Sequence, residues 1–295
     1  MSMTPASIGN ASSLPTLAFI GAGRIATALA VRLHESGYHI TGIFSRTFAH
    51  AQALAALTES SAVEDAFPDA DILFLTVPDD AILITVAAVA KQETPLLTGA
   101  VVHTSGVHSL DTLSMFPDSR SKGSFHPLYP FRKGSRLHGN EGMLVGIEAT
   151  QPNLEIWLTQ IAHAIGGNPA VLKPGSKAHY HAAAVIASNY LITLFDVSLN
   201  LMQDAGVSEA SAKIALLSLM QGNLDNLQTL SPAQALTGPI ARGDVATIAR
   251  HLSALENTAY EAFYRDMGQL TVNLAPDLDT EARTALQEIL KLAKP

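Results

Sequence analysis

The chain has 295 residues, of which 47% are hydrophobic and 15% charged, so it has enough apolar material for about two domains and is too apolar to be disordered. Its formal net charge of -8 argues against the basic surface that non-specific binding to nucleic acids or anionic membranes requires. It has no cysteine, which excludes disulfides, thiolate metal sites and a cysteine nucleophile.

Residues 1–14 are small and polar, and they lack the basic start and the apolar core of a signal peptide. We interpret them as a disordered leader. No apolar run approaches the ~18 residues that a membrane span needs, so we expect a cytoplasmic protein with no membrane or nucleic-acid partner. The only pair of the form HxH is His179–His181, and no HExxH pattern occurs, so we expect no metal.

A glycine turn lies between two predicted strands near the start of the chain. Residues 17–20 form a short apolar strand, a helical pattern follows the turn, and residues 40–44 form the second strand. This order makes the pattern Gly21, Gly23, Ala26 typical of a Rossmann dinucleotide site. A glycine turn without a nucleotide is the alternative. The residues predicted to contact the cofactor here are Gly21, Ala22, Gly23, Arg24 and Ile25.

The end of the second strand bears on which dinucleotide binds. An NAD site usually has Asp or Glu there, but no carboxylate occurs between His39 and His50. Ser45 and Arg46 stand in its place, and a hydroxyl with a guanidinium suits a 2′-phosphate. We therefore predict NADP, held by these two residues. An ordinary surface arginine is the alternative.

Further apolar strands are predicted at residues 72–77, after Gly99, in GSFHPLYPF and in GMLVGIEA. Alternating with helices, they indicate an α/β fold with a doubly wound parallel sheet, which binds ligands at the carboxyl ends of its strands. The polar residues at these strand ends have a structural alternative, in which they only pack or form turns. At these ends we predict cofactor contacts from Val77, Pro78, Asp79 and Thr104, a substrate contact from Ser105 and a catalytic role for His126.

After residues 173–175 the strand patterns stop, and Ala/Leu-rich helical patterns run to the end of the chain. We place a domain boundary near Pro174, with the dinucleotide domain at residues 15–174 and an all-helical substrate and dimerisation domain at residues 175–295. The first helix is predicted at about 176–205 and the next to about 223. A loop at 231–244 then precedes two more helices.

The first of these helices begins with polar residues that stability alone does not explain. Lys177 in its first turn opposes the helix dipole by about 0.3–1 kcal/mol. Lys177, His181 and Ser188 share one stripe of the helix, and Asn189 borders it. Such groups suit a site that binds and protonates a developing alkoxide, with the pKa of Lys177 lowered by desolvation. The alternative is that the cations are solvated and Asn189 is a core amide.

The segment TGPIARGD supplies two further substrate candidates, Thr237 and Arg242, the second as a clamp for a carboxylate. Turn formation and solvent exposure are their alternatives. Asp244 in the same segment is predicted to be the N-cap of the next helix. We interpret five further histidines as structural, namely His103, His108, His138, His163 and His251.

The motifs FIGAGRIATALA, VPDDAI, HTSG, GSFHPLYPF, YHAAAVIASNYL and LTGPIARGD together resemble a family of Rossmann-like oxidoreductases whose helical C-terminal domain has no assigned function. The resemblance covers almost the whole chain. The family is similar in layout to pyrroline-5-carboxylate reductase, ketopantoate reductase and prephenate dehydrogenase, and it implies a homodimer formed through the helical domain. Some members are thought to reduce ketopantoate in pantothenate synthesis.

Two departures qualify what the resemblance implies. Ketopantoate and β-hydroxyacid reductases have Lys followed four residues later by Asn, whereas here His181 follows Lys177 and Asn189 comes two turns later. The threonine-rich loop of pyrroline-5-carboxylate reductase is also absent.

The sequence thus predicts an NADPH-dependent reductase of a small carboxylated carbonyl compound, with ketopantoate as the best guess. Lys177 or His181 would supply the proton, and Asn189 would orient the substrate. The rivals are an imine or enol-acid oxidoreductase, a non-catalytic NADP-binding sensor and a metal-dependent hydrolase.

Overall fold

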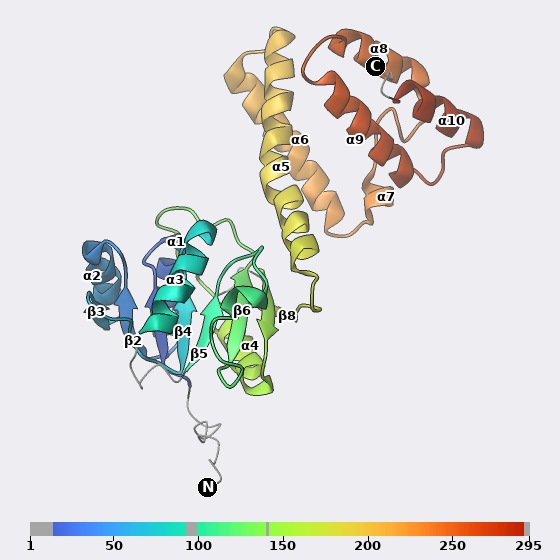
Figure 1. Cartoon of the computed structure of the whole chain (residues 1–295). Helices are drawn as coiled ribbons and strands as arrows, with labels where there is room; N and C mark the ends of the chain where they lie inside the picture. The colour runs from blue at the N-terminus through green and yellow to red at the C-terminus, as the bar shows by residue number, and fades with distance from the viewer. Residues whose placement is uncertain (1–13, 93–98, 140–141, 292–295) are drawn as a thin grey trace. The chain divides into compact units, whose positions relative to one another are not determined.

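The computed structural model describes residues 14–92, 99–139 and 142–291. The chain divides into two compact units, Met1–Asn189 and Tyr190–Pro295 (Figure 1). The predicted leader lies almost entirely outside the described residues. The first part of the long helix that starts at Lys177, up to Asn189, belongs to the first unit.

The first unit is built on an 8-stranded sheet with the order β3-β2-β1-β4-β5-β6-β7-β8. Strands β1 to β6 are parallel, β7 runs antiparallel to β6, and β8 is parallel to β7. The predicted doubly wound sheet is confirmed, with a reversal at β7. The strands are β1 (Leu17–Ile20), β2 (Ile40–Phe44), β3 (Ser61–Val63), β4 (Ile72–Leu75), β5 (Ala100–His103), β6 (Lys122–Pro127), β7 (Leu144–Ala149) and β8 (Asn168–Val171).

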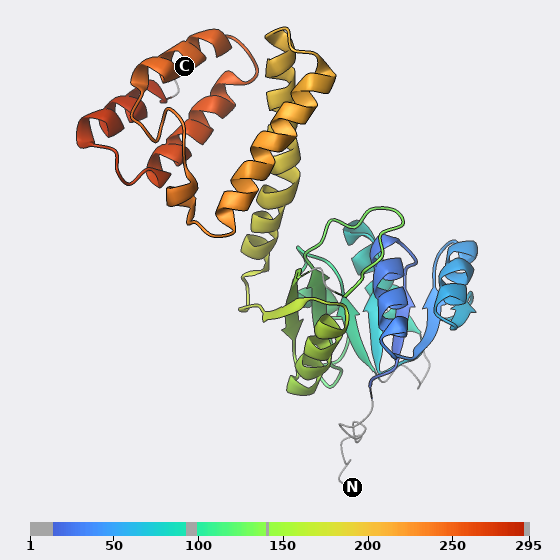
Figure 2. The ribbon, with the colours of Figure 1, turned by 180° about the vertical axis from the view of Figure 1, so that it is seen from behind.

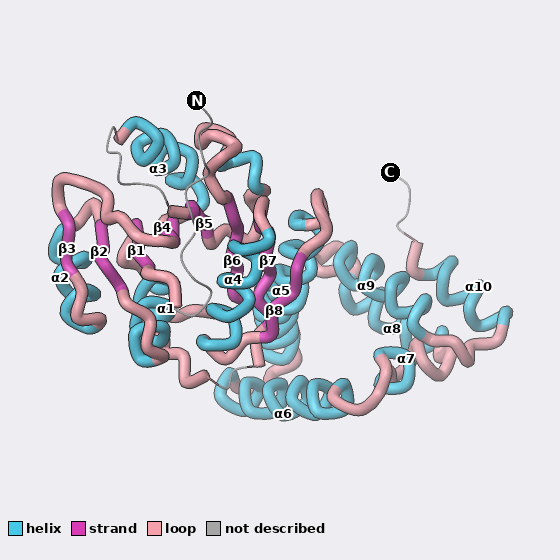
Figure 3. The backbone as a smooth tube through the Cα atoms, turned by 90° about the horizontal axis from the view of Figure 1, so that it is seen from below, coloured by secondary structure: helices cyan, strands magenta, loops and turns pink. Residues whose placement is uncertain are grey.

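Helices cover both faces of this sheet, because its central strands are apolar on both sides (Figures 1 and 2). The helices α1 (Arg24–Glu35), α2 (Phe48–Leu57) and α4 (Pro152–Ala164) pack on one face, around Phe19, Phe74 and Phe125. The helix α3 (Asp79–Lys91) and the short 3-10 helix η1 (Leu110–Leu113) pack on the other. Figure 3 shows the strands between α3 and α1.

This arrangement brings the carboxyl ends of the parallel strands to one edge of the sheet, where the predicted site residues follow β1, β2, β4 and β5. Two strands were not expected from the sequence. Both β3 and β8 are short and lie at the ends of the sheet, where no residue is fully buried. Because they lack a buried apolar run, hydrophobic periodicity does not predict them as strands.

The second unit contains only helices among its described residues. Three helices follow the loop instead of the two expected, because the pattern near the chain end divides into α9 and α10. They enclose a small core that includes Ile248, Val272 and Leu286. The helices of the chain's second half are α5 (Lys177–Asp204), α6 (Glu209–Leu227), α7 (Pro232–Ala235), α8 (Val245–Leu255), α9 (Glu261–Leu274) and α10 (Thr280–Ile289).

Asp244 caps α8 as predicted, since its carboxylate accepts a hydrogen bond from the Thr247 backbone N–H at 3.0 Å. The hydrogen bonds that the side chain and the backbone of Thr247 make to this carboxylate hold the pKa of Asp244 below its usual value. By length and composition, α5 is apolar enough to cross a membrane, since an 18-residue window within its 28 residues has a mean hydropathy of 1.6. No such stretch was expected from the sequence, because Ser188, Asn189 and Asp196 interrupt the apolar residues of this helix without lowering the mean below that of a membrane span.

Candidate functional site

The glycine turn after β1 is fixed to the neighbouring strand β4. Gly21 has a φ of +109°, and a Cβ built on it would lie 2.6 Å from the carbonyl oxygen of Thr76. The Thr76 hydroxyl also donates to the Ile20 carbonyl at 3.0 Å. Only glycine combines this left-handed backbone with so close an approach, so the turn requires Gly21; its contact with a cofactor stays a prediction.

Gly23, in contrast to Gly21, has open space around it. It is the N-cap of α1 with an ordinary extended backbone, no side chain caps the helix, and a Cβ there would meet nothing within 4 Å. The first N–H groups of α1 therefore face open space. A cleft of about 620 Å³ lies beside them, lined by Ala22, Gly23 and Arg24. The helix N-terminus and the open backbone fit a dinucleotide pyrophosphate, and these residues would hold it.

Other predicted cofactor residues lie on the same edge of the sheet. Ser45 and Arg46 connect β2 to α2, and the Arg46 side chain is exposed. Val77 and Pro78 follow β4, and Asp79 begins α3. The binding roles of these residues stay predictions.

Lys177 does not point into solvent. Its side chain is buried, and its Nζ donates to Glu148 of β7 at 3.0 Å and to the hydroxyl of Ser124 of β6. Burial beside the sheet lowers the pKa of Lys177, as predicted from desolvation. The ion pair with Glu148 opposes this shift. The solvated alternative for Lys177 is wrong. The ion pair instead fastens the start of α5 to the sheet.

His126 is held by Tyr180 from the first turn of α5. The tyrosine hydroxyl donates to the His126 carbonyl at 3.1 Å, and it lies 3.1 Å from His126 Nδ1. Because the hydroxyl has one proton and gives it to the carbonyl, Nδ1 must carry the ring proton and donate to the tyrosine oxygen. The other ring nitrogen, Nε2, is then an acceptor.

Burial and the nearby Lys177 ammonium keep His126 uncharged. Together they lower its pKa to about 4, with desolvation as the larger cause. Burial likewise raises the pKa of Tyr180 to about 12, so the hydroxyl stays protonated. At neutral pH the pair therefore presents one hydrogen-bond acceptor, the His126 Nε2.

His181, one turn after Lys177, lies against His126. Their ring centroids are 5.9 Å apart with the planes at 69°. Gly106 lies between them, since a Cβ on it would approach His181 Cδ2 to 2.4 Å and His126 Nε2 to 2.8 Å. The structure thus brings together two predicted residues that are 55 positions apart in the sequence. We call His126, Tyr180 and His181 the histidine cluster.

Four other predicted residues have local hydrogen-bond partners. The Ser105 hydroxyl oxygen accepts from the backbone N–H groups of Val107 and His108 at 3.2 and 3.0 Å, as the turn alternative expected. The Thr104 hydroxyl donates to the Leu75 carbonyl at 3.3 Å. Ser188 donates to the Ala184 carbonyl at 2.7 Å and lies 2.8 Å from Asn189 Oδ1. Their cofactor, substrate and catalytic roles stay predictions.

Thr237 and Arg242 lie in the second unit, between α7 and α8, and their substrate roles also stay predictions. His103 was expected to be structural. It is fully buried at the end of β5, and desolvation and Lys177 lower its pKa to about 3, so it is neutral.

Sequence reasoning missed four residues of the site, namely Ser124, Glu148, Tyr180 and Gly106. Glu148 stands in an apolar strand pattern, and a lone acid among buried residues is a signal for a buried ion pair. Tyr180 was read as part of an apolar helix. The other two carry no sequence signal that would have selected them.

Comparisons with known proteins agree with this geometry. Residues 16–100 match the family described as NADP oxidoreductase coenzyme F420-dependent, and residues 143–271 match the Domain of unknown function (DUF2520). The second match begins just before β7 and therefore includes the strand that carries Glu148. None of the curated proteins compared with the chain matches it.

Solved structures with the same fold include a Thermotoga maritima protein with 26% identity and a TM-score of 0.73, and a candidate NADP oxidoreductase from Bacteroides fragilis with 23% and 0.70. Each comparison covers 88% of this chain and 98% of the other. A Plasmodium falciparum pyrroline carboxylate reductase with NADP bound has 14% identity and a TM-score of 0.55, over 94% of this chain and 98% of that one.

These matches confirm the predicted class, an NADP-dependent oxidoreductase with a Rossmann-like fold. They give no substrate. In this chain a segment that matches the NADP oxidoreductase coenzyme F420-dependent family is thus followed by a segment that matches DUF2520.

Proposed function

We propose that the protein is an NADPH-dependent reductase of a small carboxylated carbonyl compound, with ketopantoate, and hence a step of pantothenate biosynthesis, as the first substrate to test. The observation that carries the proposal is the histidine cluster. It lies on the strand edge that also carries the glycine turn, with two imidazoles meeting beside Gly106. When bound, the nicotinamide supplies the hydride.

The two histidines have different tasks in this proposal. His126 Nε2 is an acceptor at neutral pH, so it orients a substrate O–H or N–H and does not donate a proton. His181 is only partly buried, and its ring lies against that of His126 in an edge-to-face arrangement. We assign proton donation to His181, because general acid catalysis needs a donor that reaches the reacting oxygen.

Lys177 supports this arrangement indirectly. Its ammonium is bound to Glu148 and Ser124, and its charge disfavours protonation of His126. We therefore favour His181 over Lys177 as the donor. Lys177 fixes the helix turn that carries Tyr180 and His181.

The acceptor state of His126 also supports a second candidate, reduction of a cyclic or open-chain imine. A protonated imine brings its own proton and needs an acceptor to bind its N–H group, which His126 Nε2 offers. The fold likeness to a pyrroline carboxylate reductase is consistent with it. The two candidates differ in whether the enzyme must supply a proton.

The test is NADPH oxidation with the purified protein, using ketopantoate and pyrroline carboxylate as separate substrates. For a carbonyl substrate, His181→Gln should lower kcat by about 10²–10⁴, the usual contribution of a general acid. For an imine substrate the same variant should change kcat less than about fivefold, whereas His126→Phe should raise KM. Arg46→Ala tests the 2′-phosphate contact, and it should raise the KM for NADPH and not for NADH.

Turnover of neither compound, despite tight NADPH binding, would contradict both candidates and favour the non-catalytic sensor. Full carbonyl turnover by His181→Gln would remove His181 as donor.

We also propose a cytoplasmic homodimer formed through the helical half. Large apolar side chains of α5 and α6 are exposed in the single chain, among them Ile192 and Ile214 at 72% and 73%. Exposed apolar surface of this kind is typical of a subunit interface, and α5 owes its membrane-like composition to the same residues. Light scattering on the purified protein would measure the oligomer size.

A further inference from the structure

A basic loop between β6 and β7 borders the dinucleotide cleft. We use this name for residues 132–136, which read Arg-Lys-Gly-Ser-Arg. Lys133, Gly134 and Ser135 line the same cleft of about 620 Å³ as Gly23 and Arg24 of the glycine turn. The loop is more than 100 residues from that turn in the sequence, and it does not belong to the strand–turn–helix motif.

The shape of the loop is fixed by its own hydrogen bonds. The Arg132 N–H donates to the Ser135 hydroxyl at 2.8 Å, and the Ser135 N–H donates back to the Arg132 carbonyl at 3.0 Å. Gly134 between them has a φ of +82°, which allows the tight turn. Lys133 therefore stands at the tip of a closed turn and keeps a defined position.

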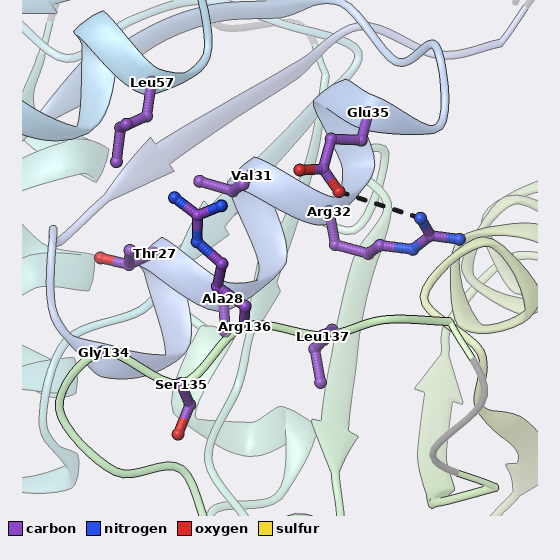
Figure 4. Close-up of a pocket in the computed structure, with 10 residues that line it drawn as sticks. All are labelled: Thr27, Ala28, Val31, Arg32, Glu35, Leu57, Gly134, Ser135, Arg136 and Leu137. Carbon is purple, nitrogen blue, oxygen red and sulfur yellow. Dashed lines mark ion pairs between the residues drawn. The ribbon is translucent and has the colours of Figure 1, made fainter.

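The two ends of the loop are anchored to the sheet unit. Phe131 packs against the main core, and Leu137 is buried. Figure 4 shows the segment from Gly134 to Leu137 running alongside α1, with the Arg136 side chain beside Val31. The anchored ends hold the basic loop over the N-terminal half of α1.

The charges around the cleft have one sign. Arg24 and Lys133 line it, His50 stands on the α2 side, and none of its described lining residues is Asp or Glu. Arg132 and Arg136 flank Lys133 in the loop. In a chain with a net charge of -8, such a local concentration of cations indicates a site for an anion.

We propose that the basic loop is a second phosphate-binding element of the dinucleotide site, in which the Lys133 ammonium binds a cofactor phosphate opposite the α1 N-terminus. This inference rests on the proposed NADPH-dependent function. The ligand chemistry is a phosphate group, and a dinucleotide offers two sources of it, the pyrophosphate and the 2′-phosphate.

Dissociation constants for NADPH and NADH, measured by nucleotide fluorescence, test the proposal. Lys133→Gln removes the charge at nearly constant size, Lys133→Arg keeps the charge, and Lys91→Gln at the far end of α3 is the matched control for net charge. We expect Lys133→Gln to weaken NADPH binding by roughly tenfold, Lys133→Arg by less than about threefold, and Lys91→Gln not measurably.

Loss of binding confined to NADPH would identify the 2′-phosphate as the ligand, and equal loss for both nucleotides would identify the pyrophosphate. Unchanged binding by Lys133→Gln, or an equal loss in Lys91→Gln, would overturn the proposal. If the wild-type protein binds neither nucleotide, the cofactor assignment itself fails, which a wild-type titration shows before any variant is made.

Discussion

The glycine turn after β1 and the histidine cluster at β6 lie on the same edge of one sheet but are built in different ways. The turn depends on main-chain geometry that Gly21 and Gly23 set within a few residues, and the close approach of Gly21 to Thr76 follows when β4 pairs with β1. The cluster depends on side chains from β6 and α5. The first is therefore a local property of the chain, and the second exists only after the sheet and α5 have packed together.

The ion pair that joins α5 to the sheet gives the largest expected effect. Lys177→Met should lower the free energy of unfolding by about 3–5 kcal/mol, because it leaves the buried Glu148 carboxylate without a partner. The matched control is Lys213→Met, which breaks the exposed pair with Glu209 and should leave the denaturation midpoint nearly unchanged, because solvent screens that pair. Urea denaturation measures both.

A double variant separates the charge from the packing. Lys177→Met combined with Glu148→Leu should recover most of the loss, since no uncompensated charge stays buried. Equal stabilities for Lys177→Met and Lys213→Met would mean that this ion pair does not stabilise the fold.

The two glycines of the turn make a sharper pair. Gly21→Ala should destabilise the fold by about 2–3 kcal/mol, because its backbone is left-handed and the new Cβ meets the Thr76 carbonyl. Gly23→Ala should leave unfolding within about 0.5 kcal/mol of wild type yet weaken NADPH binding by roughly tenfold or more, since the methyl group occupies the space for the pyrophosphate. Thermal unfolding measures the effect on folding, and nucleotide titration measures the effect on NADPH binding. Equal losses of stability in Gly21→Ala and Gly23→Ala would contradict the separate roles of the two glycines.

The smallest effect is the pH dependence that His126 introduces. Its pKa in the fold is about 4 against an ordinary 6.5, so the unfolded chain binds a proton in this range and the folded chain does not. The stability that neutral His126 contributes is therefore complete above about pH 6.5 and is lost as the pH falls toward 4. Between pH 7 and 5 the wild type should lose about 2 kcal/mol more than His126→Gln.

Denaturation curves at both pH values measure this difference, which cancels the contributions of groups that the two proteins share. Tyr180→Phe adds a second readout, because without the hydroxyl the Nδ1 proton has no fixed partner. Nitrogen NMR shifts of His126 should then show a mixture of tautomers. A single unchanged tautomer in that variant would show that Tyr180 does not position the ring.

Several elements of both units were predictable from sequence. The strands at 17–20 and 40–44, the helix between them and the cap at Asp244 follow from hydrophobic period, glycine and capping chemistry, which act within a few residues. The same reasoning failed at β3, β8 and α10. Those elements lack a long buried run, and only their neighbours in the sheet or the bundle define them.

The sequence by itself determined the class of the protein, because a dinucleotide turn is local main-chain geometry that Gly21, Gly23 and the following helix encode directly. It also placed Lys177 and His181 on one helix, one turn apart, but it did not distinguish their surroundings. Only the tertiary structure decided that Lys177 enters a buried ion pair with Glu148 while His181 meets His126. Burial and charge pairing depend on which distant strands a helix packs against, and that information is not local to the helix.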